Sequence, residues 1–332
     1  MNRRLRELLR EAGVEGPIRS DEIVMLHNNA PVPTGLIDSP WARWPWGFNF
    51  IVLHRGRARW FCKCRAASDP GLRREADVAE RLGSVRTASI RVPAVRYVTS
   101  GRFALQVAEF LDGVPLDRRI SGRDPRKLRA RVDLVLSGLA ELLTGYLRDL
   151  SSPGGEVVVE DDAAPTLQSV ITRLALDTDS RDALKDALSR AGRVRATPQH
   201  SDLWTSNVLE VHGVPWVIDF ETFGDVRVPL YDDLTLVSST LDQWLGEDPG
   251  VPHSLFREGP VVRDFIDLLA ARAAKAGLDP GQLDGILVFQ LVRRSFDVAG
   301  APGRTDAGRH DEAVRSVAKR LATGRTGLLV PS

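Results

Sequence analysis

The chain has 332 residues, of which 43% are apolar and 27% charged, as is typical of a globular protein. Its net charge of +1 argues against a nucleic-acid partner, because a binder of this size usually carries a basic excess. No apolar run is long enough to span a membrane, and the N-terminal MNRRLRELLREAG lacks the apolar stretch of a signal peptide. We therefore expect a cytoplasmic protein without a membrane partner. The length favours two domains or lobes, and the sequence carries no indication of the oligomeric state.

Residues 1–110 are predicted to form a β-rich lobe. A short helix is expected at 3–13, an irregular segment rich in Pro and Trp at 14–46, and a β-hairpin at 47–64 around the turn R-G-R. A helix follows from Asp69, which is suited to cap it, and then come two β-rich runs, AVRYVTS and FALQVAEF. This order predicts a small, mostly antiparallel sheet with one main helix against it. The two cysteines are one residue apart on a predicted strand, where we expect reduced core residues.

Residues 111–332 are predicted to form a larger, mostly helical lobe. A single apolar stripe predicts a long helix at 126–150. Further helical patterns occupy 166–177, 181–191, 230–243, 259–277, 283–299 and 310–322. Two short strands, 207–211 and 215–219, flank the turn H-G-V-P, and the acidic residues 160–162 are expected in a solvated loop.

Three polar residues lie around that short hairpin. The stretch HSDLWTSN places Asp202 and Asn207 directly before its first strand, and Asp219 ends the second strand in WVIDFE. Because a short hairpin brings its two ends together, we expect Asn207 and Asp219 to lie close in space. Their oxygens are the hard ligands that Mg²⁺ prefers, and Asp202 would then face the same cleft. Such an arrangement is what phosphoryl transfer requires: a metal clamp on the phosphates, and a carboxylate that receives the proton of an acceptor hydroxyl.

HSDLWTSN and VIDFE resemble the protein-kinase-like superfamily, in particular its aminoglycoside phosphotransferase and choline kinase branch. That branch typically reads H-G-D-x-x-x-x-N and then I-D-[FW]-[EG], and the Asp-to-Asn interval also matches the catalytic loop of protein kinases. The resemblance covers roughly residues 45–240. It implies an α+β, bilobal protein-kinase-like fold. The N-terminal lobe, 1–110, would bind the nucleotide, and the C-terminal lobe, 111–332, would carry catalysis and the acceptor.

The resemblance also implies roles for individual residues. Asp202 would be the catalytic base, and Asn207 and Asp219 would hold Mg²⁺. Lys63, in RWFCKCR, would hold the phosphates of ATP, and Glu75 on the following helix would fix Lys63.

Four further residues are assigned to the nucleotide. Backbone groups near Glu109 and Phe110, in VAEFLDG, resemble the hinge that binds adenine, and Gly47 and Asn49 in WPWGFNF are placed near the phosphates.

In PLYDDL, Asp232 or Asp233 would have a structural role. His200 is interpreted as an organiser of the loop rather than a base, and Trp204 as a packing residue with access to the acceptor.

Several departures from the family pattern narrow the function. The segment WPWGFNF has no G-x-G-x-x-G, Ser201 replaces the usual Gly of the loop, and Thr205 replaces the usual Pro. Glu221 stands where protein kinases have the Gly of D-F-G, and no A-P-E segment follows it, which argues against a protein kinase.

Two hypotheses stay open: an ATP-dependent phosphotransferase acting on a hydroxyl of a small molecule, or a non-catalytic nucleotide-binding module. The acceptor class (aminoglycoside, sugar, nucleoside or amino alcohol) and the choice between ATP and GTP stay open as well.

Overall fold

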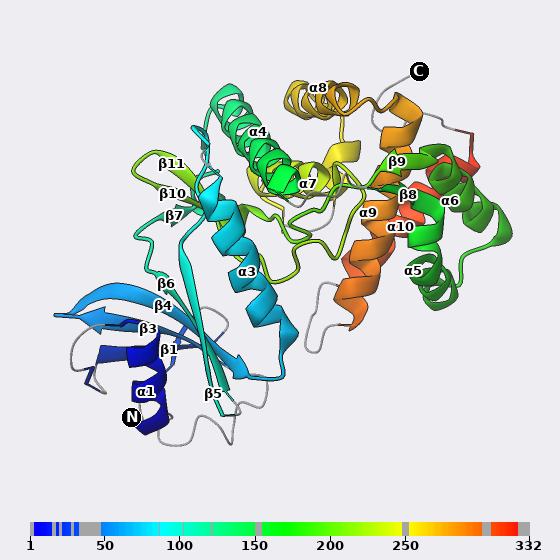
Figure 1. Ribbon diagram of the computed structural model, residues 1–332. Coiled ribbons are helices and arrows are strands. Elements are labelled where there is room, and N and C mark those ends of the chain that lie inside the picture. The colour runs from blue at the N-terminus through cyan, green and yellow to red at the C-terminus, as the bar shows by residue number, and fades with distance from the viewer. Residues whose placement is uncertain are drawn as a thin grey trace. The chain divides into compact units, whose positions relative to one another are not determined.

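The computed structural model describes residues 3–14, 18–19, 22–27, 30–32, 48–85, 87–101, 103–120, 122–149, 155–247, 252–300 and 307–324. The chain divides into two compact units. The first comprises Met1–Gly113 and Leu209–Thr222, and the second comprises Val114–Val208 and Phe223–Ser332. The first is built on a β-sheet and the second is mostly helical, which confirms the predicted α+β class (Figure 1). Within the described ranges, no helix combines the length and the apolar character needed to cross a membrane.

The first unit contains a six-stranded sheet in the order β2-β1-β3-β4-β6-β5, and all its described pairings are antiparallel. Its strands are β1 (Ile23–His27), β2 (Ala30–Val32), β3 (Phe48–His54), β4 (Arg57–Ala66), β5 (Val95–Ser100) and β6 (Phe103–Glu109). The prediction of an irregular segment at 14–46 is therefore wrong where β1 and β2 lie. These strands are short and have no clear alternation, so their structure depends on pairing with β3 rather than on a local pattern.

Two helices pack with this sheet. Helix α1 (Arg3–Glu11) contributes buried leucines to a core that includes Phe50, Cys62 and Cys64. Both cysteines are free and buried as predicted, and burial raises the pKa of the Cys64 thiol to about 12. Because side chains alternate along a strand, Lys63 lies on the opposite face of β4. Helix α3 (Pro70–Ser84) begins after Asp69, whose Oδ1 accepts a hydrogen bond from the Gly71 N–H at 2.9 Å, as a capping residue does.

The hairpin formed by β10 (Val208–Val211) and β11 (Val214–Val217) is assigned from Leu209 onward to the first unit. Arg91 makes two backbone hydrogen bonds with β11: its N–H donates to Pro215 O at 3.0 Å, and its carbonyl accepts from the Val217 N–H at 2.9 Å. Gly113 packs so closely against β10 that a Cβ there would lie 2.7 Å from Val211 Cγ2. The hairpin thus carries the segment that contains Asp219 into the sheet-bearing unit.

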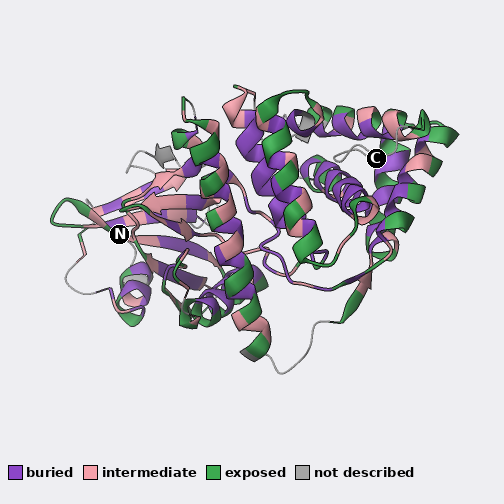
Figure 2. Cartoon of the chain, turned by 90° about the horizontal axis from the view of Figure 1, so that it is seen from above, coloured by how far each residue is buried: buried purple, intermediate pink, exposed green. Residues whose placement is uncertain are grey.

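The second unit is dominated by helices whose burial varies widely (Figure 2). They are α4 (Pro125–Asp149), α5 (Val159–Leu174), α6 (Thr178–Ala191), α7 (Tyr231–Trp244), α8 (Pro260–Lys275), α9 (Pro280–Gly300) and α10 (Ala307–Ala322). Short elements complete it: β7 (Val114–Pro115), β8 (Glu156–Val158), β9 (Arg193–Arg195) and the 3-10 helices Leu116–Arg119, Thr205–Asn207 and Pro252–Phe256.

The start of α5 differs from the prediction, because the helix begins at Val159 instead of at 166. The acidic residues 160–162 lie in the first turn of α5 instead of in a loop. Carboxylates are favourable at this position because the N-terminal end of a helix carries partial positive charge.

Candidate active site

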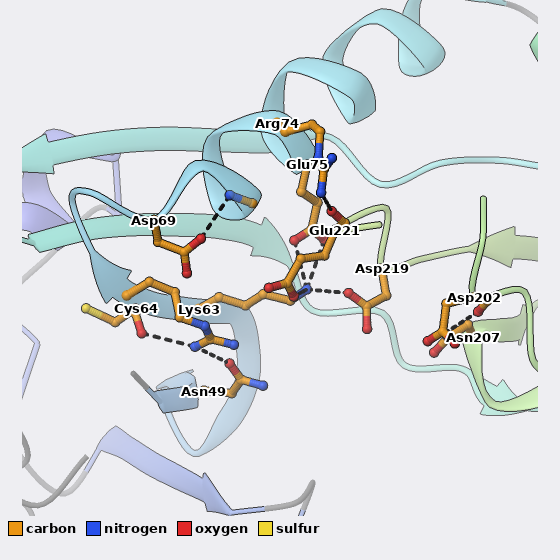
Figure 3. A network of polar contacts seen from close by, with 12 residues as sticks. Asn49, Lys63, Cys64, Asp69, Arg74, Glu75, Asp202, Asn207, Asp219 and Glu221 are labelled. Carbon is orange, nitrogen blue, oxygen red and sulfur yellow. Dashed lines mark hydrogen bonds and ion pairs between the residues drawn. The ribbon is translucent and has the colours of Figure 1, made fainter. Parts of the chain in front are cut away.

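A buried lysine is the centre of the polar network in the first unit. The ammonium of Lys63 donates to Glu75 Oε2 at 2.8 Å, to Glu75 Oε1 at 3.0 Å and to Asp219 Oδ1 at 2.6 Å (Figure 3). Glu221 Oε2 lies 3.9 Å from the same nitrogen. The side chains of Lys63 and Glu75 are only 9% and 6% exposed, whereas those of Asp219 and Glu221 are 39% and 38% exposed. The buried ion pair therefore faces solvent through two further carboxylates.

Three separate elements position these groups. Lys63 comes from β4, Glu75 from the buried face of α3, and Asp219 from the segment after β11. The backbone of Asp219 is in the left-handed region with φ of 70°, a conformation that Asp adopts more readily than most residues. The Arg74 guanidinium donates to the carbonyl of Glu221 at 2.8 Å and so ties this segment to α3.

The electrostatics of the cluster favour a charged lysine. Burial alone would lower the pKa of Lys63, but the carboxylates of Asp219 and Glu75 raise it above its ordinary value. For Glu75, burial raises the pKa and outweighs the lowering effect of Lys63. Carboxylate oxygens of Glu75, Asp219 and Glu221 all lie within 4.8 Å of one another. Such a set of hard oxygen atoms suits a divalent cation such as Mg²⁺.

The other residues assigned to the nucleotide lie on neighbouring strands. Asn49 on β3 is the partner of Lys63 in the sheet register, and its Oδ1 accepts a hydrogen bond from Arg65 at 3.1 Å. Glu109 ends β6, and its exposed side chain pairs with Arg59 at 3.3 Å. The Phe110 N–H donates to Arg59 O at 2.9 Å, so this N–H already has a hydrogen-bond acceptor within the first unit. Gly47 lies outside the described residues.

A second polar network surrounds Asp202 in the second unit. Asp202 Oδ1 accepts hydrogen bonds from Trp204 Nε1 at 2.7 Å and from Arg294 Nη1 at 3.1 Å. The guanidinium of Arg294 also stacks on the indole of Trp204, 4.0 Å from the ring centroid. The amide of Asn207 donates to the Asp202 carbonyl at 2.8 Å, and its nitrogen lies 3.4 Å from Asp202 Oδ2. One oxygen of Asp202 is thus held by two donors, while the side chain stays 39% exposed.

The loop that carries Asp202 is held from behind by a buried carboxylate. Asp232, in the first turn of α7, accepts from the N–H of His200 at 2.5 Å and from the N–H of Ser201 at 3.0 Å. Ser201 has φ of 69°, where glycine is favoured, and its hydroxyl donates to Gln199 O at 3.2 Å and accepts from the Val226 N–H at 3.0 Å. His200 is fully buried, which fits a role as an organiser of the loop. Within PLYDDL, Asp232 thus holds the loop.

The structure therefore groups the predicted residues into two networks. Lys63, Glu75 and Asp219 meet in the first unit, and Asp202 and Asn207 meet in the second. Sequence reasoning missed Arg294 and did not expect Glu221 near Lys63. A signal for Arg294 was present, since it lies in the otherwise apolar stretch GILVFQLVRRSF, and a charge buried in such a helix needs a partner.

Comparison with solved structures shows which known proteins share this fold. The aminoglycoside phosphotransferase APH(4)-Ia aligns over 95% of this chain and 97% of its own, with a TM-score of 0.57 and 13% identity. The GDP and kanamycin complex of APH(2")-IIia aligns over 97% and 98%, with a TM-score of 0.55 and 13% identity. A putative fructosamine-3-kinase from Haemophilus somnus 129PT aligns over 95% of both chains, with a TM-score of 0.54 and 14% identity. No family model and no curated protein sequence matches the chain. The likeness is thus one of structure: the chain has the α+β, kinase-like fold of these phosphotransferases.

Proposed function

We propose that the protein is an ATP-dependent phosphotransferase that moves the γ-phosphoryl group to a hydroxyl of a small molecule. The observation that carries this proposal is the carboxylate of Asp202. One of its oxygens is held by Trp204 and Arg294, and its side chain is 39% exposed in a loop that Asp232 holds from behind. A carboxylate held so firmly and yet accessible suits a base that must meet an acceptor hydroxyl in one orientation.

The first unit supplies the groups that would bind the nucleotide. Lys63, fixed by Glu75, would contact the phosphates of ATP, and the segment around Glu109 and Phe110 would contact the adenine. Asn49 and Gly47 are proposed to lie near the phosphates. Among the similar structures, an APH(4)-Ia mutant forms a ternary complex with ADP and hygromycin B, and APH(2")-IIia forms a complex with GDP and kanamycin. This supports a nucleotide and a small-molecule acceptor as the two ligands.

The charge balance around Lys63 supports a divalent cation. One ammonium group faces three carboxyl groups, so a polyphosphate would meet an excess of negative charge without a further cation. Asp219, together with Asn207, would hold Mg²⁺, which when bound neutralises charge on the phosphates. Two side chains of the protein complete the proposed site: Lys63 would orient the phosphates, and Asp202 would take the proton of the attacking hydroxyl.

A non-catalytic nucleotide-binding module is the alternative. It would need the Lys63 network but would have no use for an oriented, accessible Asp202. A protein kinase is disfavoured by Glu221 at the position of the D-F-G glycine.

The test is ADP release from Mg·ATP by the wild type and by Asp202→Ala, with a panel of aminoglycosides, sugars, nucleosides and amino alcohols. We expect one class to stimulate ADP release in the wild type, and the stimulation to be lost in the variant. Stimulation that survives in Asp202→Ala would refute the assigned base. Nucleotide binding without stimulation by any acceptor of the panel would favour the binding module.

A further inference from the structure

The second unit contains a cavity that the proposed chemistry does not use. It has a volume of about 590 Å³, within the range of small-molecule sites, and lies between α4, α8 and the segments around residues 195–199 and 229–233. Asp202, Trp204 and Arg294 are not among its lining residues. The cavity is therefore distinct from the surroundings of the proposed base.

One wall of the cavity is apolar. It is formed by one face of α4, where Ala140 is exposed and Leu147 is half-buried, whereas Leu136, Leu139 and Leu143 are buried. From Ala140 to Leu147 the helix rises by about 10 Å, at 1.5 Å per residue. An apolar strip of this kind suits the body of an apolar chain better than a compact polar molecule.

The cavity lining contains cationic side chains without ion-pair partners among the described residues, whereas its carboxylates are already engaged. Arg148, Arg195 and Lys275 line it and are exposed, and no ion-pair partner is found for them in the described part of the chain. The two acids of the lining are already engaged: Asp233 pairs with Arg272, and Asp232 accepts the N–H groups of His200 and Ser201. The cavity therefore offers positive charge without a matching free carboxylate.

We propose that this cavity binds a single-chain amphipathic anion, with an extended apolar body against α4 and a carboxylate or phosphate head near the three cations. The ligand would also contact Gln199 and Asp232, which belong to or hold the loop that carries Asp202. The proposed ligand would therefore contact residues that support the loop, but not Asp202 itself.

The test is calorimetric titration of the whole protein with dodecanoate, dodecyl phosphate and dodecyltrimethylammonium, each below its micelle concentration. We expect at least one of the two anions to bind saturably, and the cation of equal chain length to bind at least about tenfold more weakly, since several charge contacts reverse sign. Binding of dodecanoate alone assigns a carboxylate head, and binding of dodecyl phosphate alone assigns a phosphate head. Equal affinity for the anions and the cation, or no saturable binding of either anion, overturns the proposal.

Two pairs of variants locate the binding. Ala140→Trp fills the cavity from an exposed position of α4, and Leu134→Trp adds the same ring on the same helix outside the lining. We expect the first to weaken anion binding at least about tenfold and the second to leave it unchanged. Lys275→Glu should weaken it about threefold to fivefold, whereas Lys127→Glu, an exposed site on α4 outside the cavity, should not. Binding that is unchanged in both Ala140→Trp and Lys275→Glu overturns the proposal, and none of these readouts depends on phosphotransfer.

Discussion

The two polar networks have opposite arrangements of charge and burial. In the first unit a buried cation, Lys63, is held by the carboxylates of Glu75 and Asp219. In the second an accessible carboxylate, Asp202, is held by the N–H donors of Trp204 and Arg294. A buried lysine surrounded by acids stays charged and fixed, which suits a group that binds phosphates. A carboxylate held through one oxygen keeps its orientation while the side chain stays open to an acceptor. The difference in burial thus follows the difference in proposed role.

The largest expected effect comes from removing the cation of the first network. Lys63→Met would leave Glu75 buried without its partner, so we expect the free energy of unfolding to fall by about 3–5 kcal/mol. Nucleotide binding should be lost as well. Urea unfolding and nucleotide titration measure the two effects, and Lys127→Met, at an exposed position of α4, is the control. A variant as stable as the wild type would show that the pair is not a buried charge pair in solution.

Removing the cation of the second network should affect turnover more than stability. Arg294→Met is expected to lower kcat about 10²-fold with little change in KM, because Asp202 loses a donor and a neighbouring positive charge. Trp204→Phe keeps a ring for Arg294 but loses the indole N–H, so we expect a smaller drop of about tenfold.

The split between kcat and KM distinguishes positioning from general damage. In Arg294→Met kcat should fall while the KM for the acceptor changes little, a pattern that a general loss of folded protein would not produce. Arg293→Met is the control, because that side chain pairs with Asp297 instead. An unchanged kcat, or an equal loss in both variants, would contradict the role given to Arg294.

Much of both networks could be predicted from local patterns. Asp69 and Pro70 predict where α3 begins, and this places Glu75 one turn further along its buried face. The motif residues Asp202, Asn207 and Asp219 lie close together in the sequence, so their intervals can be read from it directly. By contrast, Arg294 lies 92 residues after Asp202, and no local pattern links the two. The helical pattern predicted a helix from 166, but α5 begins at Val159 and includes Pro165.

A pH dependence of stability is expected from the carboxylate behind the loop. Burial raises the pKa of Asp232 from its usual 3.8 to about 7, although the N–H groups of His200 and Ser201 oppose the rise. Because the folded value lies above the unfolded one, its stabilising contribution is full below about pH 4 and is lost as the pH rises through about 7.

Comparison with a variant isolates this contribution. The stability of Asp232→Asn should fall less between pH 4 and pH 7 than that of the wild type. Urea unfolding across this range measures the difference, with Asp186→Asn on an exposed face of α6 as the control. Parallel curves for the wild type and Asp232→Asn would mean that Asp232 stays ionised throughout.

The smallest expected effect concerns the left-handed residue of the loop. Ser201→Ala keeps the strained φ and loses the hydroxyl, so it should cost about 1–3 kcal/mol of unfolding free energy. Ser201→Gly loses the same hydrogen bonds but relieves the backbone strain, so it should be about 1 kcal/mol more stable than the alanine variant. Thermal unfolding of the pair measures the difference, and an alanine variant more stable than the glycine variant would contradict the geometry.

The division of labour between the two networks is tested most directly by calorimetric titration of Mg·AMP-PNP into the wild type, Asp202→Ala and Asp219→Ala. We expect Asp202→Ala to bind the nucleotide with nearly wild-type affinity, because Asp202 is proposed to act on the acceptor, and Asp219→Ala to bind it at least about tenfold more weakly. A wild type that does not bind the nucleotide, or an Asp202→Ala variant that loses as much affinity as Asp219→Ala, would contradict these roles.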